Sequence, residues 1–233
     1  MMFAQTTHPS AAGYTPPAPQ MPPIAQPQQF AVETRGVTKR YGRQTVVNQL
    51  NLAIPSGGVY GFLGPNGAGK STTMKMLLGL AKPTEGEVRV FGRELRANRA
   101  DILPRIGSLI EGPAFYPHLT GAQNLRIVAD YLSCDKSSID AVLDIVGLTD
   151  AAGKRARQYS LGMKQRLGIA MALISGPELL LLDEPTNGLD PAGVAEIRNL
   201  IVQLAHDRGI TVMVSSHLLS EIEQMADIVG IIQ

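Results

Sequence analysis

The segment Gly64–Ser71 constrains the fold of this chain more than any other feature. It reads Gly-Pro-Asn-Gly-Ala-Gly-Lys-Ser and fits the pattern G-x-x-x-x-G-K-[ST], whose glycines let backbone N–H groups surround a phosphate. A compact apolar run at 58–63 precedes the loop, and the apolar spacing over 70–80 predicts a helix after it. The start of that helix would direct its unpaired N–H groups and positive dipole toward the same phosphates. The loop therefore predicts a nucleotide phosphate site.

Two side chains of the loop have separate predicted roles. Lys70 is expected to bridge the β- and γ-phosphates, and the Ser71 hydroxyl to bind Mg²⁺, which prefers oxygen ligands. The predicted phosphate-binding residues are Gly64, Pro65, Asn66, Gly67, Ala68, Gly69, Lys70, Ser71 and Thr72.

Short apolar runs alternate with helical segments after the loop. We expect strands at 86–91, 179–182, 211–215 and 227–232, and a helix at 192–206. This alternation predicts an α/β fold with a parallel sheet. Three further helices, predicted at 123–132, 137–146 and 163–174, interrupt the alternation, so we expect 112–177 to form an inserted helical subdomain.

Composition excludes several classes of protein. The 233 residues carry 21 Lys and Arg against 20 Asp and Glu, which lacks the basic excess of a dedicated nucleic-acid binder. The single cysteine, Cys134, has no partner for an internal disulfide. No apolar run reaches the roughly 18–20 residues of a membrane span. We therefore expect a soluble, cytoplasmic chain that relies on other polypeptides for any membrane function.

Residues 1–29 differ in composition from the rest. They hold seven of the 16 prolines and five glutamines, and no charged side chain precedes Glu33. Proline removes backbone donors and favours extended conformers over a packed core. We expect a disordered tail, the alternative being a docking tail for a partner, and a single folded domain over 30–233.

The apolar strand at 179–182 ends in two carboxylates, Asp183 and Glu184. Side chains alternate along a strand, so the two acids are expected to do different work. Beside a phosphate loop, the first acid is expected in the coordination shell of the metal. The second is placed to deprotonate the water that attacks the γ-phosphate.

Together these motifs resemble the ATP-binding subunit of ABC transporters over roughly 30–233. Tyr41 corresponds to the aromatic residue that stacks on adenine in that family, and Ser160-Leu161-Gly162 to part of its signature loop. Asn187–Asp190 resembles the D-loop, and His217 the switch histidine. The resemblance implies a P-loop parallel sheet core with an antiparallel β subdomain and an inserted helical subdomain.

Two departures from the family pattern narrow the resemblance. Glu111 stands where the family usually has a glutamine, and Ser-Leu-Gly-Met replaces the usual Ser-Gly-Gly-Gln of the signature loop. A glutamate offers the metal a charged oxygen but repels a nearby γ-phosphate. Both features resemble the bacitracin-resistance and lantibiotic-immunity exporters. The alternative for Glu111 is an ordinary exposed acid.

The resemblance also implies partners and a mechanism. ATP with Mg²⁺ would be enclosed between the phosphate loop of one copy and the Ser160–Gly162 loop of a second ATP-binding subunit. Glu184 would act as base, while His217 holds the γ-phosphate. The motion of this dimer as it opens and closes would be transmitted through 111–125 to a separate membrane permease. The ATP-binding subunits would lie at the inner face of the membrane. Members of the family usually continue beyond the strand at 227–232, where this sequence ends, so any C-terminal element is left open.

Three other functions remain open at this stage. A non-transport ATPase of the same class would usually carry two phosphate loops or a long coiled coil, and neither is seen. A nucleotide-gated binding module without turnover would not need Glu184 or His217. A small-molecule kinase would leave the signature loop unexplained.

Overall fold

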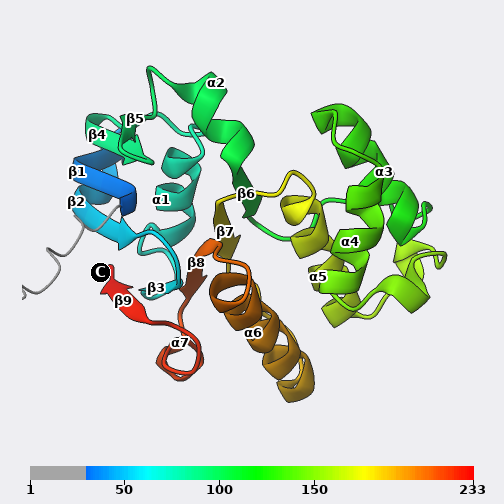
Figure 1. Ribbon diagram of the computed structural model, residues 1–233. Helices are drawn as coiled ribbons and strands as arrows, with labels where there is room; N and C mark the ends of the chain where they lie inside the picture. Colours follow the sequence, from blue (N-terminus) through cyan, green and yellow to red (C-terminus); the bar gives the residue numbers. More distant parts are fainter. Residues whose placement is uncertain (1–29) are drawn as a thin grey trace, which may run out of the picture.

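The computed structural model describes residues 30–233, which form two sheets with helices packed against them (Figure 1). The predicted tail at 1–29 lies outside the described residues. The strands are β1 (Phe30–Tyr41), β2 (Gln44–Pro55), β3 (Val59–Leu63), β4 (Glu85–Val90), β5 (Arg93–Glu94), β6 (Ile106–Leu109), β7 (Leu179–Asp183), β8 (Thr211–Ser216) and β9 (Ile228–Ile231). The α-helices are α1 (Lys70–Leu77), α2 (Arg99–Ile102), α3 (Gly121–Leu132), α4 (Ser137–Ile145), α5 (Leu161–Leu173), α6 (Pro191–His206) and α7 (Leu219–Ile222). Short 3₁₀ helices occupy Leu103–Arg105, Thr149–Ala151 and Ala156–Gln158.

The larger sheet is parallel, with the strand order β6-β7-β8-β3-β9. β3, which precedes the phosphate loop, lies between β8 and β9, and Leu63 is in register with Ser216. The ends of β3, β7 and β8 therefore meet at one edge. This is the edge at which parallel α/β sheets bind ligands. The predicted parallel α/β core is confirmed.

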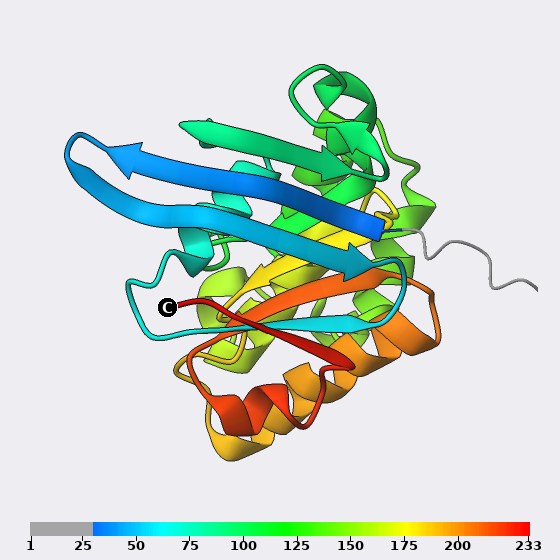
Figure 2. The same ribbon diagram turned by 90° about the vertical axis from the view of Figure 1, so that its left-hand side faces the viewer.

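The smaller sheet is antiparallel, with the order β2-β1-β4-β5. β1 and β2 form a long hairpin that turns at Gly42 and Arg43 and crosses over the parallel strands (Figure 2). α1 packs beneath this sheet, because Met74, Met76 and Leu77 share a core with its strands. The antiparallel β layer implied by the family resemblance is confirmed.

Alternate residues of the parallel strands are buried on opposite faces of the sheet. On β7, Leu179 and Leu181 belong to the core beneath the antiparallel sheet, whereas Leu180 and Leu182 belong to the core on the helical side. All four leucines are 0% exposed. A continuous apolar run with two covered faces is typical of a central parallel strand.

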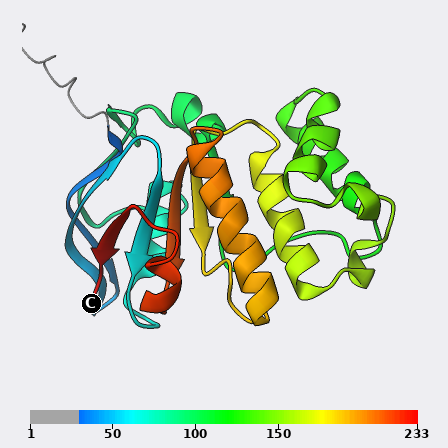
Figure 3. The same cartoon turned by 60° about the horizontal axis from the view of Figure 1, so that its bottom comes forward.

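Helices α3, α4 and α5 gather at one end of the molecule, while α6 lies along the parallel sheet (Figures 1 and 3). Leu125 of α3, Val142 of α4 and Leu167 of α5 are buried in one shared core. No helix within 30–233 has the length and apolar character needed to cross a bilayer.

Most helix and strand boundaries lie within two residues of those predicted, but α1 ends at Leu77 rather than at residue 80. The chain turns there through Gly79, whose φ is +64°. A residue without a Cβ adopts this left-handed conformation readily, which ends the helix. No residue range was predicted for β1, β2, β5, β6, α2 or α7, because polar residues or glycine interrupt the apolar pattern of each.

Candidate functional site

The phosphate loop connects β3 to α1 through a backbone that only glycine adopts readily. Gly67 and Gly69 have φ values of +85° and +99°. A Cβ on Gly69 would lie 2.7 Å from the carbonyl oxygen of Val46, so any side chain there would collide with the neighbouring strand. Gly69 caps α1 without a side-chain hydrogen bond. The first N–H groups of the helix therefore face the loop without a side-chain acceptor, as an anion site requires.

Lys70 is held inside this loop. Its side chain is only 5% exposed, and Nζ donates hydrogen bonds to the carbonyl oxygens of Gly64 at 2.7 Å and Pro65 at 3.2 Å. Nζ also lies 3.1 Å from Oε1 of Glu184. A buried ammonium needs such partners, because an unpaired charge is costly away from water. The loop thus fixes one cation beside the start of α1.

The two strand-end acids are oriented by the neighbouring strand β8. Asp183 is 7% exposed, and its Oδ1 accepts a hydrogen bond from the Ser215 hydroxyl at 2.7 Å. The backbone N–H of Glu184 donates to the same hydroxyl oxygen at 3.0 Å. Glu184 has a φ of +48°, which turns the chain sharply after Asp183. Because of this turn the two carboxylates have separate hydrogen-bond and ion-pair partners.

The Glu184 carboxylate lies between a cation and an imidazole. Oε1 faces Lys70, while Oε2 contacts Nδ1 of His217 at 2.8 Å. Oε1 is buried and has no hydrogen bond of normal geometry, although Lys70 Nζ is within ion-pair distance. One carboxylate oxygen thus keeps unused acceptor capacity inside the site.

These residues border a cavity of about 290 Å³ at the start of α1. It is lined by Val46, Asn66, Gly67, Gly69, Lys70, Ser71, Thr72 and Glu184. The donor set fits a nucleotide phosphate, since it combines free helix N–H groups, one buried ammonium and two hydroxyls. No cluster of three or more metal-ligating side chains occurs within 30–233. Ser71 lines the cavity, whereas Asp183 does not and is buried at the end of β7. Their oxygens are of the kind that Mg²⁺ prefers, and Mg²⁺ is commonly held by one or two protein oxygens together with substrate phosphates.

Glu111 follows β6 with a φ of +60° and bonds to Lys75 of α1 through its Oε1. The Glu111 side chain is 66% exposed. The hydrogen bond to Glu111 raises the pKa of Lys75, and the charges of Glu111, Tyr41 and Asp183 act in the same direction. Lys75 therefore lies near three residues of the predicted site, Glu111, Tyr41 and Asp183. Its hydrogen-bond partner is Glu111, the residue that departs from the family pattern.

Tyr41 ends β1 and is 52% exposed. The ammonium of Lys39 lies 4.6 Å from the centroid of its ring, within the range of a cation–π contact. Tyr41 does not line the cavity, although Val46 of the adjoining strand does. The ring is accessible for stacking beside the cavity rather than within it.

The predicted signature residues begin helix α5. Ser160 is its N-cap and accepts a hydrogen bond from the N–H of Met163 at 3.2 Å. Leu161 is 51% exposed, and a Cβ on Gly162 would meet no atom within 4 Å. None of the three lines the cavity at Lys70 of the same chain. The fold brings Leu161 instead beside Gly188, where an added Cβ would lie 3.5 Å from Leu161 Cδ2.

Sequence reasoning missed several residues around the site. Ser215 links Asp183 to Glu184, and Lys75 holds Glu111. Glu221 of α7 accepts hydrogen bonds from Thr186 at 2.6 Å and Ser216 at 3.2 Å, tying the chain after Glu184 to the end of β8. The pair Ser215-Ser216 before His217 was the only sequence signal for this network, and a serine pair by itself is uninformative.

Comparison with known proteins agrees with this geometry. The family described as ABC transporter matches residues 47–187. The chain is 52% identical over 204 residues to the bacitracin transport ATP-binding protein BcrA of Enterococcus faecalis, with 87% of this chain and 66% of that protein covered. It is 47% identical over 201 residues to the lantibiotic transport ATP-binding protein SrtF of Streptococcus pyogenes, with 86% of each chain covered. The chain thus spans slightly less than two thirds of the bacitracin relative.

Two solved structures share the fold. CbiO1 of Clostridium perfringens, part of the ABC transporter complex CbiONQ, has a TM-score of 0.81 and 27% identity, covering 88% of this chain and 86% of that chain. The ATP-binding cassette MJ0796, solved as a dimer bound to ADP and Pi, has a TM-score of 0.77 and 26% identity, covering 87% and 94%. The phosphate loop, the strand-end acids and these matches together establish that the chain belongs to the ABC transporter family and carries its ATP-binding fold.

Proposed function

We propose that this chain binds ATP with Mg²⁺ at the phosphate loop, hydrolyses it, and thereby energises a membrane exporter of antimicrobial peptides or other toxic compounds. The observation that carries the proposal is the contact series Lys70–Glu184–His217, in which Lys70 and Glu184 line the cavity and His217 contacts Glu184. It combines a phosphate-binding cation, a carboxylate and an imidazole at the end of the parallel sheet. In this proposal residues 30–233 act as one ATP-binding domain, with 112–177 as its helical subdomain.

The chain's own residues divide the chemistry. Gly64–Thr72 bind the phosphates through backbone N–H groups, with Lys70 as the neutralising cation. Glu184 orients and deprotonates the attacking water, and His217 contacts the γ-phosphate. Ser71 and Asp183, with Glu111 as a further candidate, hold Mg²⁺. The ion supplies positive charge that offsets the charge developing on the phosphate oxygens.

A second copy, or a related subunit, completes the site in this proposal. Ser160, Leu161 and Gly162 are accessible but do not line the cavity of their own chain. They would therefore reach the γ-phosphate only from a second molecule, while Tyr41 stacks on the base beside the cavity. ATP would favour the closed pair because it contacts both copies in that state.

The transport role rests on the relatives. The proteins named above are described as bacitracin and lantibiotic transport ATP-binding proteins. We propose that this chain likewise works with a separate permease, contacting it through 111–125 at the inner face of the membrane. Glu111 in that segment contacts α1 directly, which offers a path from the cavity to the permease. Nucleic acid is not proposed as a partner, since the net charge is only +1.

The test uses the purified chain with ATP and Mg²⁺. Phosphate release should rise with the square of protein concentration at low concentration, because each site needs two molecules. Glu184→Gln with ATP should sediment as a dimer, and with ADP as a monomer. A monomer that hydrolyses ATP at a rate proportional to protein concentration would contradict the shared site. Absence of phosphate release alongside tight ATP binding would instead support a non-hydrolysing nucleotide-gated module.

The exporter role needs a cellular measurement. The chain is expressed with its membrane partner in a bacitracin- and lantibiotic-sensitive host, and growth inhibition is compared with that of a host carrying Glu184→Gln. Wild type should raise the inhibitory concentration of at least one compound. Equal sensitivity of both hosts to the whole set would contradict export of such compounds.

A further inference from the structure

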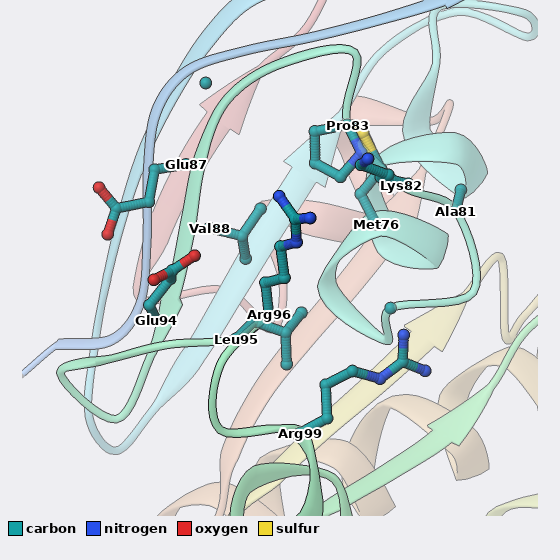
Figure 4. Close-up of a pocket in the computed structure, with 12 residues that line it drawn as sticks. Met76, Ala81, Lys82, Pro83, Glu87, Val88, Glu94, Leu95, Arg96 and Arg99 are labelled. Atoms are coloured by element: carbon teal, nitrogen blue, oxygen red, sulfur yellow. The ribbon is translucent and has the colours of Figure 1, made fainter.

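A second cavity, of about 470 Å³, lies at the opposite end of α1 from the phosphate loop (Figure 4). It is formed by the end of α1, the segment 81–83, strands β4 and β5, and the start of α2. None of its lining residues lines the cavity at Lys70. Its volume is within the range of small-molecule sites. It is therefore a separate site, joined to the phosphate loop by one helix.

The floor of this cavity is apolar. Met76 of α1, Val88 of β4 and Leu95 after β5 are 1%, 6% and 4% exposed. These side chains are anchored in the core beneath the antiparallel sheet. An apolar ligand group entering the cavity would contact side chains that are already ordered, so little conformational entropy would be lost on binding.

The rim of the cavity carries three cations: Lys82, Arg96 and Arg99. Within 30–233, none of their side-chain nitrogens takes part in an ion pair or in a hydrogen bond of normal geometry. Two acids, Glu87 and Glu94, also line the cavity, and Glu87 is paired with Arg89 at 3.1 Å. Figure 4 shows Arg96 extending between Val88 and Lys82. The donors of the two guanidinium groups are therefore free for a ligand.

Arg99 is held in position at the end of α1. Its guanidinium carbon would lie 3.1 Å from a Cβ built on Gly79, so glycine is needed for this close packing. The C-terminal end of a helix favours a nearby cation. The last carbonyls of α1, on Met74, Lys75 and Met76, already accept backbone hydrogen bonds. No hydrogen bond from the Arg99 guanidinium to these carbonyls occurs within 30–233, so its donors are not used there.

From this arrangement we propose that the cavity binds a small organic anion, a carboxylate or phosphate monoester carrying an apolar group. The apolar group lies on Met76, Val88 and Leu95, and the anionic group receives hydrogen bonds from Arg96 and Arg99. Guanidinium groups suit this role because two parallel N–H donors match a carboxylate or phosphate. A bound anion would contact α1 at the end remote from Lys70.

The test uses the full chain with ¹³C-methyl methionine and octyl phosphate as the probe. The Met76 methyl resonance should shift saturably, while that of Met225, buried in the other core, should not. Inorganic phosphate and octyl glucoside each lack one half of the proposed ligand, and should bind at least about tenfold more weakly. Equal binding of inorganic phosphate or of octyl glucoside would overturn the proposal, as would a Met76 resonance that does not respond.

Substitutions locate the binding. Arg96→Gln combined with Arg99→Gln should weaken octyl phosphate binding by about tenfold or more. Arg93→Gln is the matched control, because Arg93 is paired with Asp101 at 3.0 Å and does not line the cavity. Lys70→Ala should leave the affinity unchanged within about twofold. Loss of binding in Lys70→Ala would assign the probe to the phosphate loop and overturn the proposal. Unaltered octyl phosphate binding in the Arg96→Gln, Arg99→Gln double variant would also overturn the proposal.

Discussion

Lys70 Nζ lies 3.1 Å from Glu184 Oε1, so the cation of the phosphate loop and the acid after β7 form an ion pair in the wall of the cavity. The pair is mostly buried, with side chains 5% and 20% exposed. A γ-phosphate entering the loop would compete with Glu184 for Lys70. The carboxylate would then be released toward water and His217, which couples phosphate binding to the positioning of the base.

Replacing the base should separate binding from turnover. Glu184→Gln is expected to keep ATP binding, because an amide of the same shape does not repel the phosphates. Its turnover should fall by roughly 10²–10⁴-fold, the usual contribution of a positioned base. Phosphate release and calorimetric titration measure the two effects. Glu223→Gln, an exposed acid on the turn after α7, serves as control. Wild-type turnover in Glu184→Gln would show that another group is the base.

Removing the loop cation should abolish tight ATP binding. Lys70→Ala deletes the ammonium that lines the cavity and leaves Glu184 without its partner. The uncompensated carboxylate would then repel the phosphates as well. Calorimetry should show a loss of at least about tenfold in affinity, as expected for a charge-assisted contact. Lys136→Ala, at an exposed position before α4, is the control, and unchanged affinity in Lys70→Ala would refute this assignment.

Substitutions of Glu111 and of its partner Lys75 should have opposite effects on the Mg²⁺ dependence of phosphate release. If Glu111 assists Mg²⁺ binding, Glu111→Gln should raise the Mg²⁺ concentration needed for half-maximal phosphate release by about two- to fivefold. Lys75→Gln should lower it, because the glutamate is no longer held by a competing cation. The size follows from partly exposed charge interactions of about 0.5–1 kcal/mol. Shifts in the same direction for both variants would mean that Glu111 is only an exposed partner of Lys75.

Ser160 has a structural and a proposed functional role that two substitutions separate. Ser160→Ala removes the cap of α5 and should cost about 1 kcal/mol of unfolding free energy. Ser160→Asp keeps a good cap but places a negative charge toward the γ-phosphate of the second copy. In the Glu184→Gln background, it should abolish the ATP-dependent dimer while urea unfolding stays near wild type. A dimer that persists with Ser160→Asp would argue that this loop does not meet the phosphate.

The pH dependence of stability should include a contribution from Asp227. Its Oδ2 accepts a hydrogen bond from the N–H of Val59 at 2.7 Å and contacts His206 at 3.1 Å. The Val59 bond, helped by His206, lowers the pKa of Asp227 below its ordinary value of 3.8. A lowered pKa means that this stabilisation is complete above the unfolded pKa and is lost as the pH falls through the folded value.

Asp227→Asn should therefore reduce the unfolding free energy by about 0.5–1 kcal/mol at pH 7, a modest value because the carboxylate is half exposed. The difference from wild type should shrink as the pH falls below the ordinary value of 3.8 and through the lowered pKa of Asp227. Urea unfolding at several pH values measures it, with Asp207→Asn as control. A difference that stays constant over this range would show that ionisation of Asp227 is not its cause.

The local amino-acid pattern was sufficient to predict the phosphate loop and most of the helices and strands. Glycine spacing, an apolar strand and a following helix specify the loop through backbone geometry alone, so Gly64–Ser71 could be identified with its neighbouring elements. The leucine run before Asp183 was sufficient for a buried strand, because an uninterrupted apolar segment of that length needs two covered faces. The family relationship likewise followed from the order of short motifs.

Contacts between residues far apart in the sequence could not be predicted from local sequence patterns. Glu111 meets Lys75 across 36 positions, and Ser215 meets Asp183 across 32. Neither contact produces a periodic pattern in the sequence, because each depends on which strand ends are neighbours in the sheet. The rim of Lys82, Arg96 and Arg99 is similar, since the segments 81–83 and 94–99 bring the cations to one apolar floor.

Backbone conformation and side-chain periodicity are local properties, and they made the phosphate loop, the strand-end acids and the alternating elements predictable from the amino-acid order alone. The pairing of Glu184 with Lys70 and His217 was decided by the order β7-β8-β3 in the sheet. That order brings three strand ends together although long stretches of chain separate them. Electrostatic and hydrogen-bonding partners act only over a few ångströms, so tertiary packing alone selects them.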